Sequence, residues 1–115
     1  MQLINVIEIP SQNCIMVIRE KRVTRFITLN NIVYISSCSY LSVVHTTSGE
    51  EIIVSKILKA FEHSLDGLGF IRISRSIMVN LFYVDRYEAG KRSMLVMSNG
   101  MLFSVTRKYS MCFSR

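Results

Sequence analysis

The chain has 115 residues, of which 50% are hydrophobic, and carries a formal net charge of +6. This size and composition suit one domain with a real core and argue against disorder. The longest apolar runs are short, as at residues 14–18 and 32–35, which excludes a membrane-spanning helix. Residues 1–12 contain Glu8 but no Lys or Arg, so they lack the basic start of a signal peptide. We therefore expect a single cytoplasmic domain over residues 1–115.

The cysteines argue against covalent or metal cross-links. Cys14, Cys38 and Cys112 are an odd number, lie far apart in the sequence and form no C-x-x-C pair. This spacing is untypical of a disulfide framework or a zinc site. Because their neighbours are apolar, we expect reduced thiols that pack as small hydrophobic side chains.

The positive charge is concentrated toward the C-terminus. Of the 14 Lys and Arg residues, eight lie in residues 71–115, where the only acidic residues are Asp85 and Glu88; residues 1–70 are balanced. A concentrated positive field suits a polyanion, either nucleic acid or an anionic membrane. A basic, solvated surface without a partner remains the alternative at this point.

The N-terminal half has the pattern of short β-strands separated by turn-forming clusters. The predicted strands cover residues 3–9, 14–18, 23–29, 32–35, 40–46 and 52–54. The predicted turns and loops are residues 10–13, 19–22, 30–31, 36–39 and 47–50.

One helix is predicted at residues 55–66. Ser55 is a favourable N-cap, and Gly67 and Gly69 supply a stop. The apolar residues between them recur at helical spacing: Ile57, Leu58, Phe61 and Leu65. We expect this helix to lie across a sheet, with Phe61 and Leu65 in the core.

The C-terminal half returns to strands. They are predicted at residues 70–73, 77–80, 82–87, 94–97 and 101–105, with a charged turn at 88–93. Ser98-Asn99-Gly100 lies between two apolar runs, and Asn-Gly in that setting is a strong β-hairpin signal. The predicted fold class is therefore mostly β.

No arrangement of residues typical of an enzyme is present. His45, a predicted surface strand residue, and His63 lack metal-ligand spacing, the glycines form no phosphate-binding loop, and no G-x-S-x-G occurs. The helix lacks the basic face and apolar anchor of a membrane-surface helix. We expect no catalytic residue, metal site, cofactor, small-molecule substrate or membrane partner.

Two compact basic clusters remain, at residues 72–80 and 106–109. The first combines Arg72 and Arg75 with small hydroxyl side chains, a mixture typical of phosphate and base-edge contacts. The second follows the Asn-Gly hairpin. Each cluster alone is equally consistent with surface charges at strand ends.

These clusters belong to a wider resemblance: residues 14–112 resemble the LytTR family, the DNA-binding output domain of many bacterial response regulators. The most specific stretch is residues 70–80, FIRISRSIMVN, which is similar to the family pattern F-x-R-x-H-R-S-x-x-V-N. Further similar stretches are the strand at 32–35, the hairpin at 40–46 with Gly49, Asn99-Gly100, and VTRKY at 105–109, which resembles the pattern S-R-x-Y.

The resemblance implies an elongated, mostly antiparallel β fold with one short helix. It also implies a bacterial transcriptional regulator that binds duplex DNA sequence-specifically, with loops rather than a recognition helix in the major groove. Three contact loops are implied, at residues 37–40, 74–76 and 106–108.

The resemblance also implies roles for individual residues. Arg75 and Arg107 would read bases, because arginine can bind guanine O6 and N7 bidentately. Lys108, Arg72 and Lys91 would contact phosphates, which position the protein on DNA. The other implied contact residues are Ser37, Ser39, Tyr40, Ser74, Ser76 and Thr106. For Tyr40, a place in the interface and a place in the core are equally supported.

Two positions depart from the family pattern. Ser74 replaces the usual histidine and loses its ring, whereas Thr106 replaces a serine and keeps the hydroxyl. The change at Ser74 leaves open a rival, a protein-interaction module that kept the fold and lost DNA binding. The expected partners are duplex DNA and, on repeated half-sites, a second copy of the chain. The sequence leaves open both a free-standing regulator and a domain of a longer protein.

Overall fold

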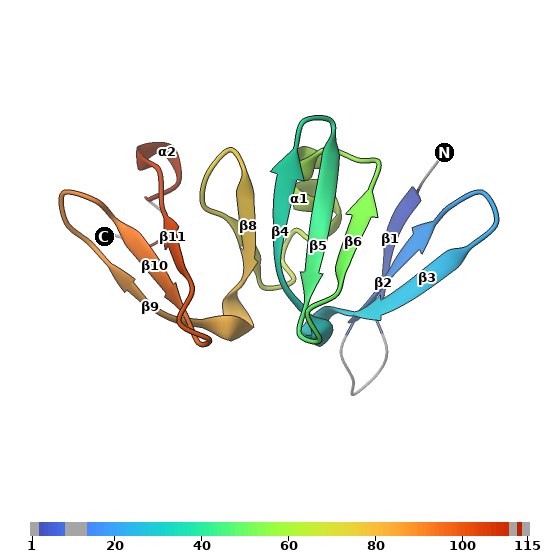
Figure 1. The fold of residues 1–115 in the computed structure, drawn as a ribbon, viewed down its shortest axis with the longest axis horizontal. Coiled ribbons are helices and arrows are strands. Elements are labelled where there is room, and N and C mark those ends of the chain that lie inside the picture. The colour runs from blue at the N-terminus through green and yellow to red at the C-terminus, as the bar shows by residue number, and fades with distance from the viewer. Residues whose placement is uncertain (1–2, 9–13, 111–112, 114–115) are drawn as a thin grey trace.

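The computed structural model describes residues 3–8, 14–110 and 113. In these ranges the chain forms antiparallel sheets arranged side by side along the long axis, with overall dimensions of 47 × 35 × 25 Å (Figure 1). The expected elongated, mostly β fold is therefore confirmed. Within the same ranges, no helix has both the length and the apolar character needed to cross a bilayer.

The N-terminal sheet has the order β1-β2-β3. Its strands are β1 (Leu3–Glu8), β2 (Cys14–Arg19) and β3 (Thr24–Thr28). All three predicted strands are present, while Ile9 and the predicted turn at residues 10–13 lie outside the described residues. The 3₁₀ turn η1 (Leu29–Asn31) then leads into the central sheet at the predicted break.

The central sheet has the order β6-β5-β4-β8-β7. Its strands are β4 (Ile32–Cys38), β5 (Leu41–Thr46), β6 (Glu51–Val54), β7 (Phe70–Arg72) and β8 (Ile77–Asn80). The prediction of a loop at residues 36–39 is wrong for most of its length, because β4 continues to Cys38. Ser36 pairs with Val43 on one side and Ile77 on the other, so pairing to both neighbours outweighs the weak strand preference of serine.

The C-terminal sheet has the order β11-β10-β9. The 3₁₀ turn η2 (Leu81–Tyr83) precedes β9 (Val84–Glu88), so the strand predicted from residue 82 begins later. Strands β10 (Met94–Met97) and β11 (Leu102–Ser104) pair antiparallel around the predicted Asn-Gly turn. Gly100 has φ of 91°, a left-handed conformation that glycine adopts without a steric penalty.

The helix α1 (Leu58–Ser64) is shorter than predicted. Its N-cap is Ile57, which has extended backbone angles, and not Ser55. The Ser42 hydroxyl donates to the Lys56 carbonyl at 2.6 Å, which holds the segment before the helix against β5. Phe61 and Leu65 are fully buried, as predicted.

A second helix, α2 (Arg107–Ser110), was not predicted. It is a single turn in which the Thr106 carbonyl accepts from the Tyr109 and Ser110 N–H groups at 2.9 and 3.0 Å. Four residues are too few to show helical periodicity in a sequence. The implied contact loop at residues 106–108 is therefore mostly helical.

Two hydrophobic clusters lie on opposite faces of the central sheet. Met78 of β8 joins the cluster shared with the N-terminal sheet and α1, whereas the next residue, Val79, joins the cluster shared with the C-terminal sheet. Neighbouring residues of a strand point to opposite faces, so β8 serves both clusters. This packing fixes the strand ends that carry the basic segments.

Asn80 makes a buried set of hydrogen bonds where the central sheet meets its flanking 3₁₀ turns. Asn80, 5% exposed, donates from Nδ2 to the Leu29 and Ile32 carbonyls at 3.2 and 2.9 Å, and its Oδ1 accepts from the Phe82 N–H at 3.0 Å. One side chain therefore joins the ends of η1, β4 and β8 to η2.

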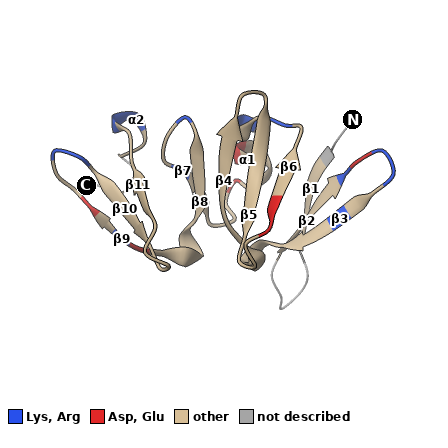
Figure 2. Ribbon diagram, in the orientation of Figure 1, with Lys and Arg blue, Asp and Glu red and all other residues tan. Residues whose placement is uncertain are grey.

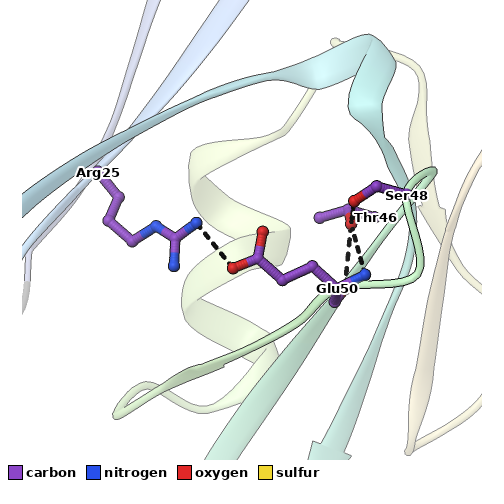
Figure 3. A network of polar contacts seen from close by, with 4 residues as sticks. All are labelled: Arg25, Thr46, Ser48 and Glu50. Atoms are coloured by element: carbon purple, nitrogen blue, oxygen red, sulfur yellow. Dashed lines mark hydrogen bonds and ion pairs between the residues drawn. The ribbon is translucent and has the colours of Figure 1, made fainter.

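A second contact, at the surface, links β3 to the turn between β5 and β6 (Figure 3). Arg25 donates to Glu50 at 3.0 Å. The Thr46 hydroxyl contacts the Ser48 hydroxyl and the backbone of Glu50 at 3.0–3.1 Å, which shapes the turn. Exposed pairs of this kind add little stability.

Candidate nucleic-acid interface

Three segments implicated by the sequence meet at one edge of the molecule. The β4–β5 turn, the β7–β8 loop and α2 all lie along the upper edge in Figure 1. The Ser37 N–H donates to the Ser76 carbonyl at 2.9 Å, and the Thr106 N–H donates to the Ile73 carbonyl at 3.0 Å. Backbone hydrogen bonds therefore tie the β7–β8 loop to the segment on either side of it.

The β4–β5 turn presents Tyr40 to solvent. The turn has two residues, because Cys38 pairs with Leu41, and Ser39 has φ of 59°. Tyr40 is 83% exposed, so its alternative place in the core is wrong. Ser37 is half-buried in β4 and Ser39 is exposed.

The β7–β8 loop is a tight turn with Arg75 at its tip. Ile73 is fully buried, and its N–H donates to the Ile77 carbonyl at 3.0 Å, which anchors the base of the loop. The Ser74 hydroxyl accepts from the Ser76 N–H at 3.2 Å. Arg75 and Ser76 are exposed. Ser74, where the resemblance implies a histidine, therefore shapes the loop.

Arg72, expected to contact phosphate, is engaged within the protein. Its side chain is only 17% exposed. Its guanidinium donates to the Ser74 carbonyl at 3.0 Å, to the Arg75 carbonyl at 2.7 Å and to Glu62 at 3.1 Å.

The α2 turn carries Arg107 and Lys108 into solvent directly after Thr106, which is also exposed. The Lys108 ammonium lies 5.4 Å from the centre of the Tyr109 ring, within cation–π range. Both cations are thus placed by a helical turn that the Thr106 backbone anchors to the β7–β8 loop.

Two hollows flank these segments and contain cations that sequence reasoning missed. One, of about 420 Å³, is lined by Lys91, Arg92 and Arg107 among others. The other, of about 570 Å³, includes Ser39, Lys59, Arg75 and Ser76. The expected residue Lys91 is therefore near Arg107, and Arg92 and Lys59 join the basic edge. Only the packing of α1 and the β9–β10 turn places these two residues there.

Ion pairing separates the basic residues of the C-terminal half into two groups. Arg86 contacts Asp85 and Glu88 at 2.6 and 2.7 Å, and these carboxylates raise its pKa. Within the described residues, no ion pair forms at Arg75, Lys91, Arg92, Arg107 or Lys108. Figure 2 shows Lys and Arg, without Asp or Glu beside them, on the β7–β8 loop, on the β9–β10 turn and on α2. This edge therefore carries uncompensated positive charge.

His45 lies in β5, near the end that is farther from the β4–β5 turn, in a structural environment. It is half-buried, stacks on Tyr34 with ring centres 4.0 Å apart, and contacts the Ser36 hydroxyl at 2.8 Å through Nε2. Burial lowers the pKa of His45 below its ordinary value. The carboxylate of Glu51, 3.4 Å from Nδ1, raises this pKa by a smaller amount. Tyr34 also packs on Phe103, so the cluster joins the central and C-terminal sheets. His45 was expected at the surface, and the structure shows that it is half-buried.

Cys14 and Cys38 are free thiols, and Cys112 lies outside the described residues. In the part of the chain that the structure describes, no group of three or more His, Cys, Asp and Glu side chains could hold a metal ion.

Cations without acidic partners along one edge of a domain are the electrostatic footprint of nucleic-acid binding. Residues 22–114 match the LytTr DNA-binding domain family, and the chain belongs to this family. That family is defined by DNA binding and not by an enzymatic activity.

The fold is shared with a solved structure described as the LytTr DNA-binding domain of a putative methyl-accepting/DNA response regulator from Bacillus cereus. The two share 20% sequence identity with a TM-score of 0.70, over 86% of this chain and 92% of that one. A comparison with curated proteins found no match.

Proposed function

We propose that the chain is a bacterial transcriptional regulator that binds specific sequences of duplex DNA in the cytoplasm. The β7–β8 loop and α2 enter the major groove, where Arg75 and Arg107 read base edges. The β4–β5 turn, with Ser37, Ser39 and Tyr40, lies beside them. One observation carries this proposal: the exposed cations of these segments lack acidic partners in the described residues, and backbone hydrogen bonds hold the segments together.

The other residues of the edge position the protein on the backbone. Lys108 and Lys91 contact phosphates, and Arg92 and Lys59 extend the same track, because each is an exposed cation beside the reading segments. Ser76 and Thr106 are exposed hydroxyl donors next to Arg75 and Arg107. Ser74 keeps the loop in shape. On repeated half-sites, two copies of the chain bind side by side.

The first test is selection of bound sequences from random duplex DNA, followed by titration with salt. If about six phosphates are neutralised, the logarithm of the association constant falls against the logarithm of salt concentration with a slope near roughly −5. An enriched motif with this slope supports the proposal. A slope near zero, or no binding at low salt, favours the rival protein-interaction module.

A pair of matched variants tests where the charge acts. Lys91 and Arg92 lie in the β9–β10 turn, and Lys21 and Arg22 form the same dipeptide, equally exposed, between β2 and β3. Changing Lys91 and Arg92 to Ala should reduce the slope by about 2 and weaken binding to every sequence. The same change at Lys21 and Arg22 should leave the slope nearly unchanged. Equal effects would mean that binding follows net charge and not this edge.

A further inference from the structure

Arg72 lines the same hollow as Arg75 and Lys59, but its side chain is only 17% exposed and its guanidinium is engaged within the protein. Two of its guanidinium nitrogens bind consecutive carbonyls of the β7–β8 loop, Ser74 at 3.0 Å and Arg75 at 2.7 Å. A third binds Glu62 of α1 at 3.1 Å. One planar group thus fixes the backbone on which the exposed Arg75 is carried.

The same guanidinium also reaches α2. Its Cζ atom lies 5.9 Å from the centre of the Tyr109 ring, within the range of a cation–π contact. Tyr109 follows Arg107 and Lys108 in the same helical turn. Arg72 therefore contacts the loop that carries one proposed base reader and the turn that carries the other.

We propose that Arg72 is a positioning residue that sets the sequence specificity of the domain: it holds the β7–β8 loop, and with it Arg75, in the geometry that reads DNA. Its hydrogen bonds to two loop carbonyls and to Glu62 replace the phosphate contact expected from the sequence. This inference rests on the proposed function, since it assumes that Arg75 faces a base. Side chains that read bases must be held within about 0.5 Å of the productive geometry. A loosened loop therefore loses sequence specificity while its positive charge is unchanged.

Arg72→Lys separates loop positioning from a phosphate contact, because it keeps the positive charge and removes the planar guanidinium with its several N–H donors. A lysine ammonium cannot reproduce the planar geometry that binds both carbonyls and Glu62. We expect affinity for the selected site to fall about tenfold, affinity for random DNA to change by less than about threefold, and the salt slope to stay the same. Arg22→Lys, the same substitution at an exposed site between β2 and β3, is the control and should change none of these.

Glu62→Gln supplies a second variant that leaves both loop carbonyl contacts in place. If Arg72 positions the loop, weakening its ion pair should lower the ratio of selected-site to random affinity. If Arg72 contacts phosphate directly, releasing it from Glu62 should strengthen binding to all sequences and leave the ratio unchanged. Glu62→Gln also decides the matter should Arg72→Lys fail to fold.

A measurement without DNA separates this inference from the proposed function. In NMR spectra of the free protein, the amide signals of residues 74–76 should move in Arg72→Lys and remain in place in Arg22→Lys. Signals that do not move, together with an unchanged affinity ratio in both Arg72→Lys and Glu62→Gln, would overturn the positioning role while leaving DNA binding intact. Absence of DNA binding by the unaltered protein would instead overturn the proposed function and the specificity role with it.

Discussion

Replacing Asn80 by Ala tests how the sheets are held together. Asn80 makes hydrogen bonds to Leu29, Ile32 and Phe82 from a side chain that is 5% exposed. A buried hydrogen bond contributes about 1 kcal/mol net, so the loss of all three should lower the free energy of unfolding by about 3 kcal/mol. For a domain of this size, the melting temperature should fall by roughly 10 °C.

The assay is urea unfolding followed by far-UV circular dichroism, with thermal melts of the same samples. Asn31→Ala is the matched control, because Asn31 is an exposed asparagine nearby in η1. It should change the free energy of unfolding by no more than about 0.5 kcal/mol. If Asn80→Ala costs less than about 1 kcal/mol, or no more than Asn31→Ala, then these hydrogen bonds do not hold η1, β8 and η2 together.

The remaining predictions concern α1 and the histidine cluster. Phe61→Ala removes a fully buried ring and should lower the free energy of unfolding, measured in urea, by about 3–5 kcal/mol. Lys59→Ala, at an exposed site, should lower it by no more than about 0.5 kcal/mol. Equal losses would mean that the buried face of α1 is misassigned. Because burial lowers the pKa of His45 below its ordinary value of 6.5, protonation favours the unfolded chain, so the contribution of His45 to stability is complete above about pH 6.5 and declines as the pH falls below it. His45→Gln should flatten this decline below about pH 6.5, and an unchanged decline would place its origin elsewhere.

Much of the fold was predictable because local patterns and tertiary packing agree. Alternating apolar residues marked the strands, and Asn99-Gly100 marked the β10–β11 hairpin through the left-handed conformation that Gly100 adopts. The helical spacing of Phe61 and Leu65 identified the buried face of α1.

The errors arose where tertiary contacts outweigh local preference. Ser36 and Ser37 suggested a loop, but pairing on both sides keeps Ser36 in β4, and Ser37 bonds to Ser76 across the sheet. Ser55 suggested the start of α1, whereas the bond from Ser42 to Lys56 holds that segment in a different conformation. Neither partner could be inferred from the sequence near the residue itself.

The residues of the proposed site were largely named from the sequence, but their roles depend on the structure. From its sequence context, Arg72 was expected to contact phosphate. Only the structure shows that its guanidinium binds Glu62 and the carbonyls of the β7–β8 loop. Lys59 and Arg92 looked like ordinary surface charges, because their proximity to Arg75 and Arg107 depends on long-range packing.

The central claim, that exposed arginines on this edge read DNA sequence, is tested most directly by Arg75→Ala. Affinities for the selected site and for random duplex DNA are measured at one salt concentration, after each variant is shown to fold. We expect Arg75→Ala to cost about 1–3 kcal/mol on the selected site and much less on random DNA. Lys108→Ala, the control for a phosphate contact, should weaken both by similar amounts. If Arg75→Ala also weakens both equally, Arg75 contributes only charge, and its role as a base reader is wrong.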